Sequence, residues 1–294
     1  MKPAVDKRIM GLLLVTMTIF HSYAQEARPD RCGSMDLLLQ KFKLHPALKI
    51  QFDAREKELK RAVSERLQRA TTGTEKAETF LTVPVVFHIV LPNPAVVTDA
   101  QIQAQMDTLN KDYAGINADT SVIPSWFKGL FGKANIQFAL AQQTSDGEST
   151  TGIDRVTSSH GTFDYTSSDV KHNSTGGVNA WNTNNYLNVW ITQITSGYLG
   201  ISTFPADGDS ANQGIMIDYR SLPGGSYTNY NFGKTLTHEI GHYFNLYHIW
   251  GDDGGSCSGT DYVNDTPNQG NFTSGGPTGV VTDACTTTSP GILY

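Results

Sequence analysis

The chain has 294 residues, of which 38% are hydrophobic and 17% charged, and its formal net charge is −6. This length and apolar content suffice for one sizeable core plus a smaller segment. The negative balance gives no electrostatic reason to expect nucleic acid as a partner. Few charges and many Gly, Ser, Thr and Asn residues are typical of a loop-rich extracellular protein rather than a helical cytosolic one.

The N-terminus has the pattern of a secretory signal. Lys2, Lys7 and Arg8 precede the apolar run 9–20, and the residues at 22–24 suit a cleavage site. We therefore predict a signal peptide over residues 1–24. The apolar run is too short for a transmembrane helix, and no later stretch approaches the ~20 apolar residues needed. The sequence thus predicts a secreted protein without stable membrane insertion.

Residues 25–78 differ in composition from everything that follows. The stretch Ala47–Ala70 has charged residues paired at i,i+4 spacing, such as Glu56 with Lys60, and a modest apolar stripe. This pattern predicts a helix lying on something larger. The following Thr71–Thr74 is typical of an exposed linker that proteases can cut. We interpret 25–78 as a prosegment and 79–294 as the domain that follows it.

The domain begins with strand and helix patterns in turn. The β-branched and aromatic run 80–91 predicts a buried strand, in which His88 is expected to be a hydrogen-bonded core residue. Thr98 and Gln101 form a capping box for an amphipathic helix that ends near Tyr113. Four further short strands are expected at 135–141, 186–192, 199–204 and 214–219. Together these elements predict an α+β fold with a sheet of about five strands and two helices packed on one side.

The stretch 238–248 carries the strongest chemical pattern. His238 and His242 are four residues apart, so on a helix both imidazoles can face one metal ion. His248 can join them only if the chain turns after His242, and Asn245 is the residue that best tolerates a left-handed turn. Three imidazoles with one open position are typical of catalytic zinc, and Glu239 is then placed to act as general base. The alternative is a chance match on an ordinary core helix.

An acidic, Gly-rich loop follows this motif. Asp252, Asp253, Asp261 and Asp265 have few basic partners nearby, and such oxygen-rich loops suit Ca²⁺. The spacing is not that of an EF-hand, so a merely solvated loop is the alternative. We expect Zn²⁺ as the cofactor, with Ca²⁺ as a possible second ion.

The chain has three cysteines, an odd number for an oxidising compartment. Cys257 and Cys285 lie in the same Gly-rich C-terminal region and form the natural pair. The disulfide would contribute about 3–4 kcal/mol if it is unstrained. Cys32, in the expected prosegment, is left over.

The motif 238–248 resembles the extended zinc-binding motif of the metzincin metalloproteases. Further stretches are similar to the pappalysin-like secreted bacterial branch, of the cytophagalysin and ulilysin type: Val83–His88, Tyr186–Trp190 and Asp265–Pro267. The resemblance runs from about Phe80 to the last residue. It implies a metzincin-type zincin with a twisted, mixed sheet, an active-site helix and an irregular C-terminal subdomain. It also implies a zinc endopeptidase acting on proteins or peptides, and it too suggests the 257–285 disulfide.

Two further expectations come from the resemblance. Metzincin sheets end in an antiparallel edge strand, here Leu199, Gly200 and Ile201, whose free backbone groups can pair with an extended substrate. Several metzincins are also kept latent by a prosegment cysteine that occupies the fourth position on zinc. Arg31-Cys32-Gly33 is similar to such a cysteine switch, and an unpaired or intermolecular Cys32 is the alternative.

The chain departs from the family pattern at two points. Asn245 replaces a Gly, which the left-handed preference of Asn makes tolerable. The second departure is that no Met follows Met216, whereas metzincins pass a Met-containing turn beneath the zinc soon after the third His. From this we expect the sequence as given to bind zinc weakly and to be feebly active, with Tyr294 too near the end to support the reaction. A catalytically impaired zinc-binding secreted protein is therefore the alternative function, and another zinc amidase or deacetylase is a weaker one.

Overall fold

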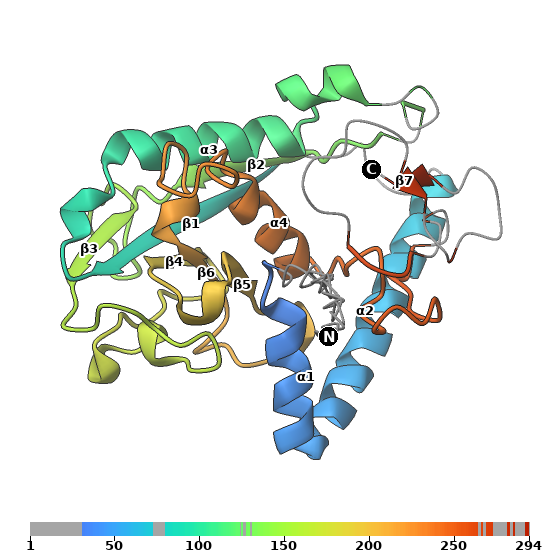
Figure 1. The fold of residues 1–294 in the computed structure, drawn as a ribbon, viewed down its shortest axis with the longest axis horizontal. Helices are drawn as coiled ribbons and strands as arrows, with labels where there is room; N and C mark the ends of the chain where they lie inside the picture. Colours follow the sequence, from blue (N-terminus) through green and yellow to red (C-terminus); the bar gives the residue numbers. More distant parts are fainter. Residues whose placement is uncertain are drawn as a thin grey trace, which may run out of the picture.

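A computed structural model describes residues 31–72, 80–123, 125, 128–129, 131–263, 266, 269–272, 281–282, 285 and 292–293. A six-stranded sheet lies at its centre, and a pair of N-terminal helices lies beside the sheet (Figure 1). Short 3₁₀ helices occupy many of the connections: Pro94–Val96, Ala118–Val122, Asp169–Lys171, Asn173–Thr175, Thr195–Gly197, Pro205–Asp207 and Tyr219–Ser221. The predicted signal peptide, residues 1–24, lies outside the described residues.

The long strand β1 (Leu81–Leu91) organises the sheet. Along one edge it pairs first with β2 (Ile136–Leu140) and then with β3 (Ile153–Thr157), and along the other edge it pairs with β4 (Leu187–Thr192). Next come β6 (Ile215–Asp218) and the edge strand β5 (Gly200–Ser202), which is the one antiparallel member among these six strands. The sheet is therefore mixed, as predicted.

The sheet has one strand more than the five that were predicted individually. The five predicted strands are present within a few residues of their expected ends, and β3 is the addition. Its sequence, Ile153–Thr157, contains two charged residues and lies in a Ser-, Thr- and Gly-rich stretch. Such a short half-exposed strand carries little hydrophobic periodicity. It forms because the second half of β1 offers unpaired backbone groups beside it.

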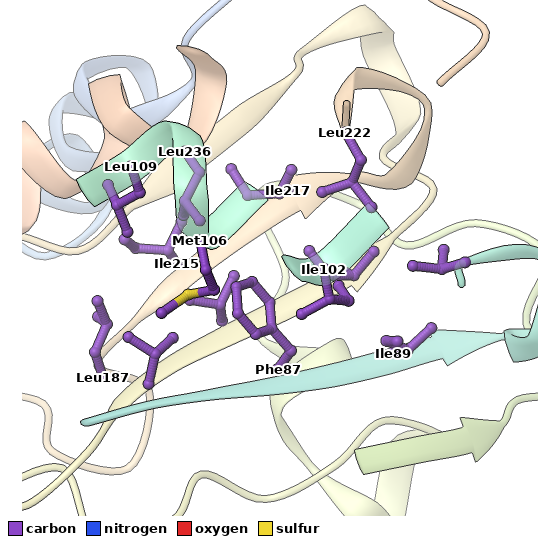
Figure 2. Close-up of a cluster of buried hydrophobic side chains, with 14 of the residues drawn as sticks. Phe87, Ile89, Ile102, Met106, Leu109, Leu187, Ile215, Ile217, Leu222 and Leu236 are labelled. Carbon is purple, nitrogen blue, oxygen red and sulfur yellow. The ribbon is translucent and has the colours of Figure 1, made fainter. Parts of the chain in front are cut away.

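Helices α3 (Asp99–Tyr113) and α4 (Lys234–Tyr243) cover one face of the sheet. The predicted capping box at the start of α3 is confirmed, since Thr98 accepts from the Gln101 N–H and Gln101 accepts from the Thr98 N–H. Apolar side chains from both helices meet those of the strands in one buried cluster (Figure 2), which includes Phe87, Ile89, Ile102, Met106, Leu109, Leu187, Ile215, Ile217, Leu222 and Leu236. This packing holds α4 firmly against the sheet.

The opposite face of the sheet is covered by loops and by a second apolar cluster around Trp190 and Met216. His88 stacks on the Trp190 ring at 5.4 Å, and its two ring nitrogens lie 3.2 Å from Asp154 Oδ2 and 3.0 Å from Asn188 Oδ1. The side chain is fully buried. The prediction of a hydrogen-bonded core histidine is confirmed.

Two helices form an N-terminal hairpin, α1 (Ser34–Leu44) and α2 (Pro46–Thr71), drawn in blue in Figure 1. The charged helix predicted at 47–70 corresponds to α2, whereas α1 was not predicted. Leu38 of α1 and Phe52 of α2 pack on Phe204 and Ala206, which follow β5. The hairpin is thus docked beside the edge strand of the sheet. None of the helices formed by the described residues combines the length and the apolar character that a membrane span requires.

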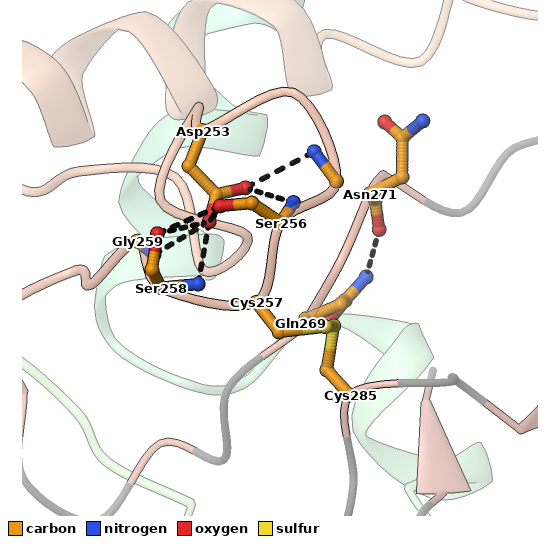
Figure 3. Close-up of a disulfide and its surroundings, with 9 residues drawn as sticks. Asp253, Ser256, Cys257, Ser258, Gly259, Gln269, Asn271 and Cys285 are labelled. Atoms are coloured by element: carbon orange, nitrogen blue, oxygen red, sulfur yellow. Dashed lines mark hydrogen bonds between the residues drawn. A yellow bond between two sulfur atoms is a disulfide. The ribbon is translucent and has the colours of Figure 1, made fainter.

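Among the described residues after α4, the regular elements are the strands β7 (Val281–Thr282) and β8 (Ile292–Leu293), which pair with each other. A disulfide joins Cys257 to Cys285, with a Cα–Cα distance of 5.2 Å (Figure 3). Beside it, the Asp253 carboxylate accepts hydrogen bonds from the backbone N–H groups of Ser256, Ser258 and Gly259. These contacts hold the 253–259 loop in its compact shape.

Candidate metal centre

Three imidazoles converge beside the C-terminal half of α4. His238 and His242 stand one turn apart on the helix, with their Nε2 atoms separated by 3.1 Å. His248 Nε2 lies 3.1 Å from that of His242 and 3.3 Å from that of His238. Zinc bonds of ~2.0–2.1 Å in a tetrahedron would place neighbouring nitrogens roughly 3.3 Å apart. The observed spacing therefore fits one zinc ion.

A left-handed turn brings His248 back to the helix. α4 ends at Tyr243, and Asn245 follows with a φ of 73°. The Leu246 N–H then donates to the Gly241 carbonyl oxygen at 2.9 Å, which closes the turn. The prediction that Asn245 makes this turn is confirmed. Asn can replace Gly here because it is among the residues that enter this region most readily.

Hydrogen bonds on the far side of two rings fix their tautomers. His242 Nδ1 donates to the Leu246 carbonyl oxygen at 2.8 Å, and His248 Nδ1 donates to the Asp252 carboxylate at 2.8 Å. A neutral imidazole whose Nδ1 carries the proton presents a lone pair on Nε2. The converging Nε2 atoms of these rings are therefore acceptors, and a cation is the partner that suits them.

The surroundings favour the neutral forms of His238 and His242. Burial lowers the pKa of His242 to about 4, and the neighbouring His248 adds to this effect. His238 is more open to solvent on one side. Its pKa is lowered as well, mainly by burial of the ring and also by the two neighbouring imidazoles. Neutral imidazole is the form that binds metal. His238 and His242 are thus in the form that binds a metal ion at neutral pH.

Glu239 lies deep between α4 and the edge strand, with 1% of its surface exposed. It approaches β5 so closely that a Cβ atom on Gly200 would stand 2.6 Å from its Cγ. Its Oε2 accepts a hydrogen bond from the Ser34 hydroxyl at 2.8 Å. Ser34 was missed by the sequence reasoning, and its place directly after Cys32-Gly33 was the signal that could have revealed it.

Cys32 lies at the same centre. Its Sγ is 3.3 Å from His242 Nε2 and 3.8 Å from Glu239 Oε2. Ligand atoms of Cys32, His238, His242 and His248 all lie within 4.8 Å of one another, and they form the only such group of metal-ligating side chains in the described part of the chain. The structure thus places a thiol where a fourth zinc ligand would stand.

The residues around Cys32 pair with the edge strand that was predicted to bind substrate. The Leu199 N–H donates to the Arg31 carbonyl oxygen at 2.8 Å, and the Gly33 N–H donates to the Gly200 carbonyl oxygen at 3.0 Å. Ser34 Oγ accepts from the Ser202 N–H at 2.8 Å. Residues 31–34 therefore extend the sheet by a short parallel segment next to β5.

A cavity of about 240 Å³ adjoins Glu239 on the side of Leu199. Arg31 enters this space, where its guanidinium group lies 5.6 Å from the Tyr230 ring centroid and donates to the Gly197 carbonyl oxygen at 3.0 Å. The edge strand, the cavity and the imidazoles thus form one continuous surface along which residues 31–34 run.

The described carboxylates of the acidic loop have different hydrogen-bond partners. Both carboxylate oxygens of Asp252 face His248 Nδ1, and Oδ1 also accepts from Trp250 Nε1 at 2.9 Å. Asp253 is bonded within its own loop, and Asp261 accepts from the Val263 N–H. Asp265 lies outside the described residues. The three described carboxylates do not form a common ligand group, and calcium stays a prediction.

Comparisons with known sequences match this chain to metalloproteases. The sequence model described as Pregnancy-associated plasma protein-A, of the peptidase M43 family, matches residues 164–289. An extracellular metalloprotease of Neurospora crassa is 36% identical over 226 residues, which cover 74% of this chain and 66% of that protein. This chain therefore spans just under two thirds of that relative's length.

Solved structures from Tannerella forsythia are also similar. Mature mirolysin in complex with a cleaved peptide is 44% identical, with a TM-score of 0.71, and the match covers 74% of this chain and 82% of that one. A variant of promirolysin is 36% identical, with a TM-score of 0.75, and the match covers 89% and 84% of the two chains. With this identity and coverage and the converging imidazoles of α4, the chain belongs to the peptidase M43 family, the pappalysin-like metzincin metalloproteases.

Proposed function

We propose that this protein is a secreted zinc endopeptidase that is synthesised as a latent proenzyme. Residues 1–24 would be its signal peptide, 25–78 its prosegment and 79–294 its catalytic domain. The observation that carries the proposal is the convergence of three imidazole Nε2 atoms beside the buried Glu239 carboxylate. The family and the extracellular relative support the same interpretation.

In this proposal His238, His242 and His248 hold zinc. When bound, zinc supplies a Lewis acid that polarises the substrate carbonyl and lowers the pKa of water. Glu239 then accepts the proton of the attacking water and passes it to the leaving amine. Leu246 and Asp252 orient the ligand rings from behind, as their hydrogen bonds to His242 and His248 imply.

Latency would come from three contacts of the N-terminal segment. Cys32 would bind zinc in its fourth position, which its short distance to His242 supports. Ser34 would cover the Glu239 carboxylate, and residues 31–34 would block the outer side of the edge strand. The comparisons support a proenzyme form, because the promirolysin variant matches 89% of this chain and mature mirolysin 74%. Water and substrate would gain access only when this segment leaves.

The substrate would be an extended protein or peptide segment. The backbone of Leu199, Gly200 and Ile201 on the outer side of β5, which residues 31–34 cover in this structure, suits a peptide that adds one strand to the sheet. Mature mirolysin has been solved in complex with a cleaved peptide, which supports this substrate class for a relative. We infer the same class here.

The test is to measure metal content by mass spectrometry together with casein cleavage, before and after limited proteolysis of the full chain. We expect one zinc per chain throughout and cleavage only after processing. Changing Glu239→Ala should leave zinc bound and reduce turnover by at least ~10². Glu148→Ala, at an exposed loop position, is the matched control and should change neither quantity.

Three outcomes would contradict the proposal. Loss of zinc in the Glu239→Ala variant would assign Glu239 to the metal rather than to proton transfer. Zinc without any peptidase activity after processing would favour a non-catalytic zinc protein instead. Cleavage of small non-peptide amides in place of casein would point to a different zinc hydrolase.

A further inference from the structure

Asp112, near the end of α3, holds the first turn of α4. Its Oδ1 accepts a hydrogen bond from the Lys234 ammonium at 2.7 Å, and its Oδ2 accepts one from the Thr237 hydroxyl at 2.8 Å. The Asp112 side chain is only 7% exposed. One carboxylate oxygen is therefore bonded to the first residue of α4, and the other to the residue directly before His238.

This contact lies at an end of α4 that has no acidic residue and no side-chain cap of its own. The residue before the helix is Gly233, and the first turn contains Lys234 and Thr237 but no carboxylate. The first N–H groups of a helix carry a partial positive charge that a nearby carboxylate stabilises. Asp112 supplies this negative charge from α3. Gln105, also in α3, donates to the Gly233 carbonyl oxygen at 2.9 Å, so α3 determines where α4 begins.

His238 is the imidazole whose direction depends most on the placement of α4. His242 and His248 each donate from Nδ1 to an oxygen behind the ring. The polar contacts that His238 makes within the described part of the chain are those of its Nε2 atom with the other two rings, and one side of its ring is open to solvent. The backbone of α4 therefore aims this ring, because no bond behind the ring does so.

A small rotation of α4 about its axis would misplace His238. Leu236 and Ile240 are buried in the apolar core and oppose a translation of the helix, but apolar contacts are not directional and fix its rotation less well. A nitrogen about 6 Å from the helix axis moves by roughly 0.5 Å when the helix turns by about 5°, which is the tolerance of a preorganised site. The directional bond from Thr237 to Asp112 opposes this rotation.

We propose that Asp112 is a positioning residue of the metal centre, which aims His238 at the zinc position by holding Lys234 and Thr237. The inference rests on the proposed zinc peptidase function and adds a residue outside the set of metal ligands to it. Asp112 would contact neither the metal nor the substrate. It would change zinc affinity through His238, and not through His242 or His248, which are oriented by their own hydrogen bonds.

The test measures the zinc affinity of the full unprocessed chain with a chromophoric chelator. In this chain Cys32 lies at the same centre, so a variant that lacks one imidazole keeps three ligating side chains. We expect Asp112→Asn to weaken zinc binding by about tenfold, the lower end of the range for residues that orient a ligand. In a His238→Ala background the same change should alter zinc affinity by less than about twofold, whereas in a His248→Ala background it should keep its full effect.

A pair of variants at Thr237 tests the contact without changing any charge. Thr237→Val removes the hydroxyl group and keeps the branched shape, so it should weaken zinc binding by about fivefold. Thr237→Ser keeps the hydroxyl group and should stay within about twofold of the parent.

Two controls separate this role from general effects. Asp119→Asn removes a carboxylate that also lies 2.7 Å from the Lys234 ammonium but is 64% exposed. Asn110→Ala loosens α3 on another side, because Asn110 exchanges two hydrogen bonds with the backbone of Phe138 in β2. Both variants should keep the parental zinc affinity, although Asn110→Ala should lower the urea midpoint of the metal-free chain.

Parental zinc affinity in both Asp112→Asn and Thr237→Val, in a chain that binds zinc, would overturn the inference and leave the peptidase proposal intact. An equal loss of affinity in Asn110→Ala, or an undiminished effect of Asp112→Asn in the His238→Ala background, would also overturn it. Either result would mean that Asp112 supports the fold in general and not the direction of His238. A parent chain that binds no zinc would refute the proposed function, and this inference with it.

Discussion

The hydrogen bond between Asp252 and His248 gives a sharp test of the metal centre. We predict that Asp252→Asn weakens zinc binding by about 10–100-fold, the usual effect of losing a partner behind a ligand histidine. The structure explains why the effect should be large: the side chains of His248 and Asp252 are only 2% and 13% exposed, so water cannot replace the contact. An amide oxygen could still accept one bond, but it lacks the charge, and Trp250 Nε1 competes for it. The expected loss corresponds to roughly 1.4–2.8 kcal/mol.

The assay is a zinc titration against a chromophoric chelator, with the processed chain so that Cys32 does not contribute a ligand. Asp253→Asn is the control, because it removes the neighbouring charge while its contacts lie within the 253–259 loop. We expect its zinc affinity to stay within about threefold of the parent, allowing for loosening of the loop. Equal zinc affinity of Asp252→Asn and the parent would refute the orienting role. A selective loss of calcium binding in that variant would instead support the calcium expectation for this loop.

Three further predictions concern latency, the general base Glu239 and the pH dependence of stability. Cys32→Ala should give the unprocessed chain measurable casein cleavage or faster self-processing, and a silent variant would mean that the hairpin alone keeps it latent. Gly200→Ala should reduce kcat of the processed enzyme by at least ~10-fold, because the methyl group collides with the Glu239 side chain, while zinc content stays unchanged. Burial lowers the pKa of Lys171 to about 7, so the unfolded chain binds more protons than the folded chain between about pH 7 and pH 10. The contribution of Lys171 to the free energy of unfolding of the unprocessed chain should therefore rise with pH in that window. Urea titrations at a series of pH values should show this rise, and Lys171→Met should remove it.

Sequence reasoning could predict those features of the site that depend on local spacing. The i,i+4 relation of His238 and His242 follows from helix geometry, and the turn at Asn245 follows from its backbone preference. The strands with long apolar runs were also predictable, because burial on both faces selects such residues along β1 and β4. The cysteine at the metal centre was suggested by the resemblance, and the structure brings Cys32 within reach of the imidazoles.

The features that were missed depend on contacts between distant parts of the chain. Ser34 and Arg55 reach their partners only after the hairpin docks. Ser34 had one local signal, its place directly after Cys32-Gly33, and the immediate sequence of Arg55 offers none. Asp252 was interpreted as part of a calcium loop because four acidic residues lie close together in sequence. Its carboxylate faces His248, a relation that depends on how the loop folds back.

The pairing pattern of β1 has a consequence for how the protein reaches its folded state. Leu81 pairs with Ile136 and Val85 with Leu187, so the neighbours of this central strand lie more than fifty and more than a hundred residues further along the chain. Closing such long loops costs entropy before any strand contact compensates for it, which makes folding slow. The N-terminal hairpin, by contrast, is built from local contacts and can form early. Because it docks on β5 and on the segment after it, we expect the hairpin to speed the last step, in which the antiparallel edge joins the parallel strands. Refolding of the processed enzyme should then be slower than refolding of the whole chain, and the added 31–72 peptide should restore part of the rate.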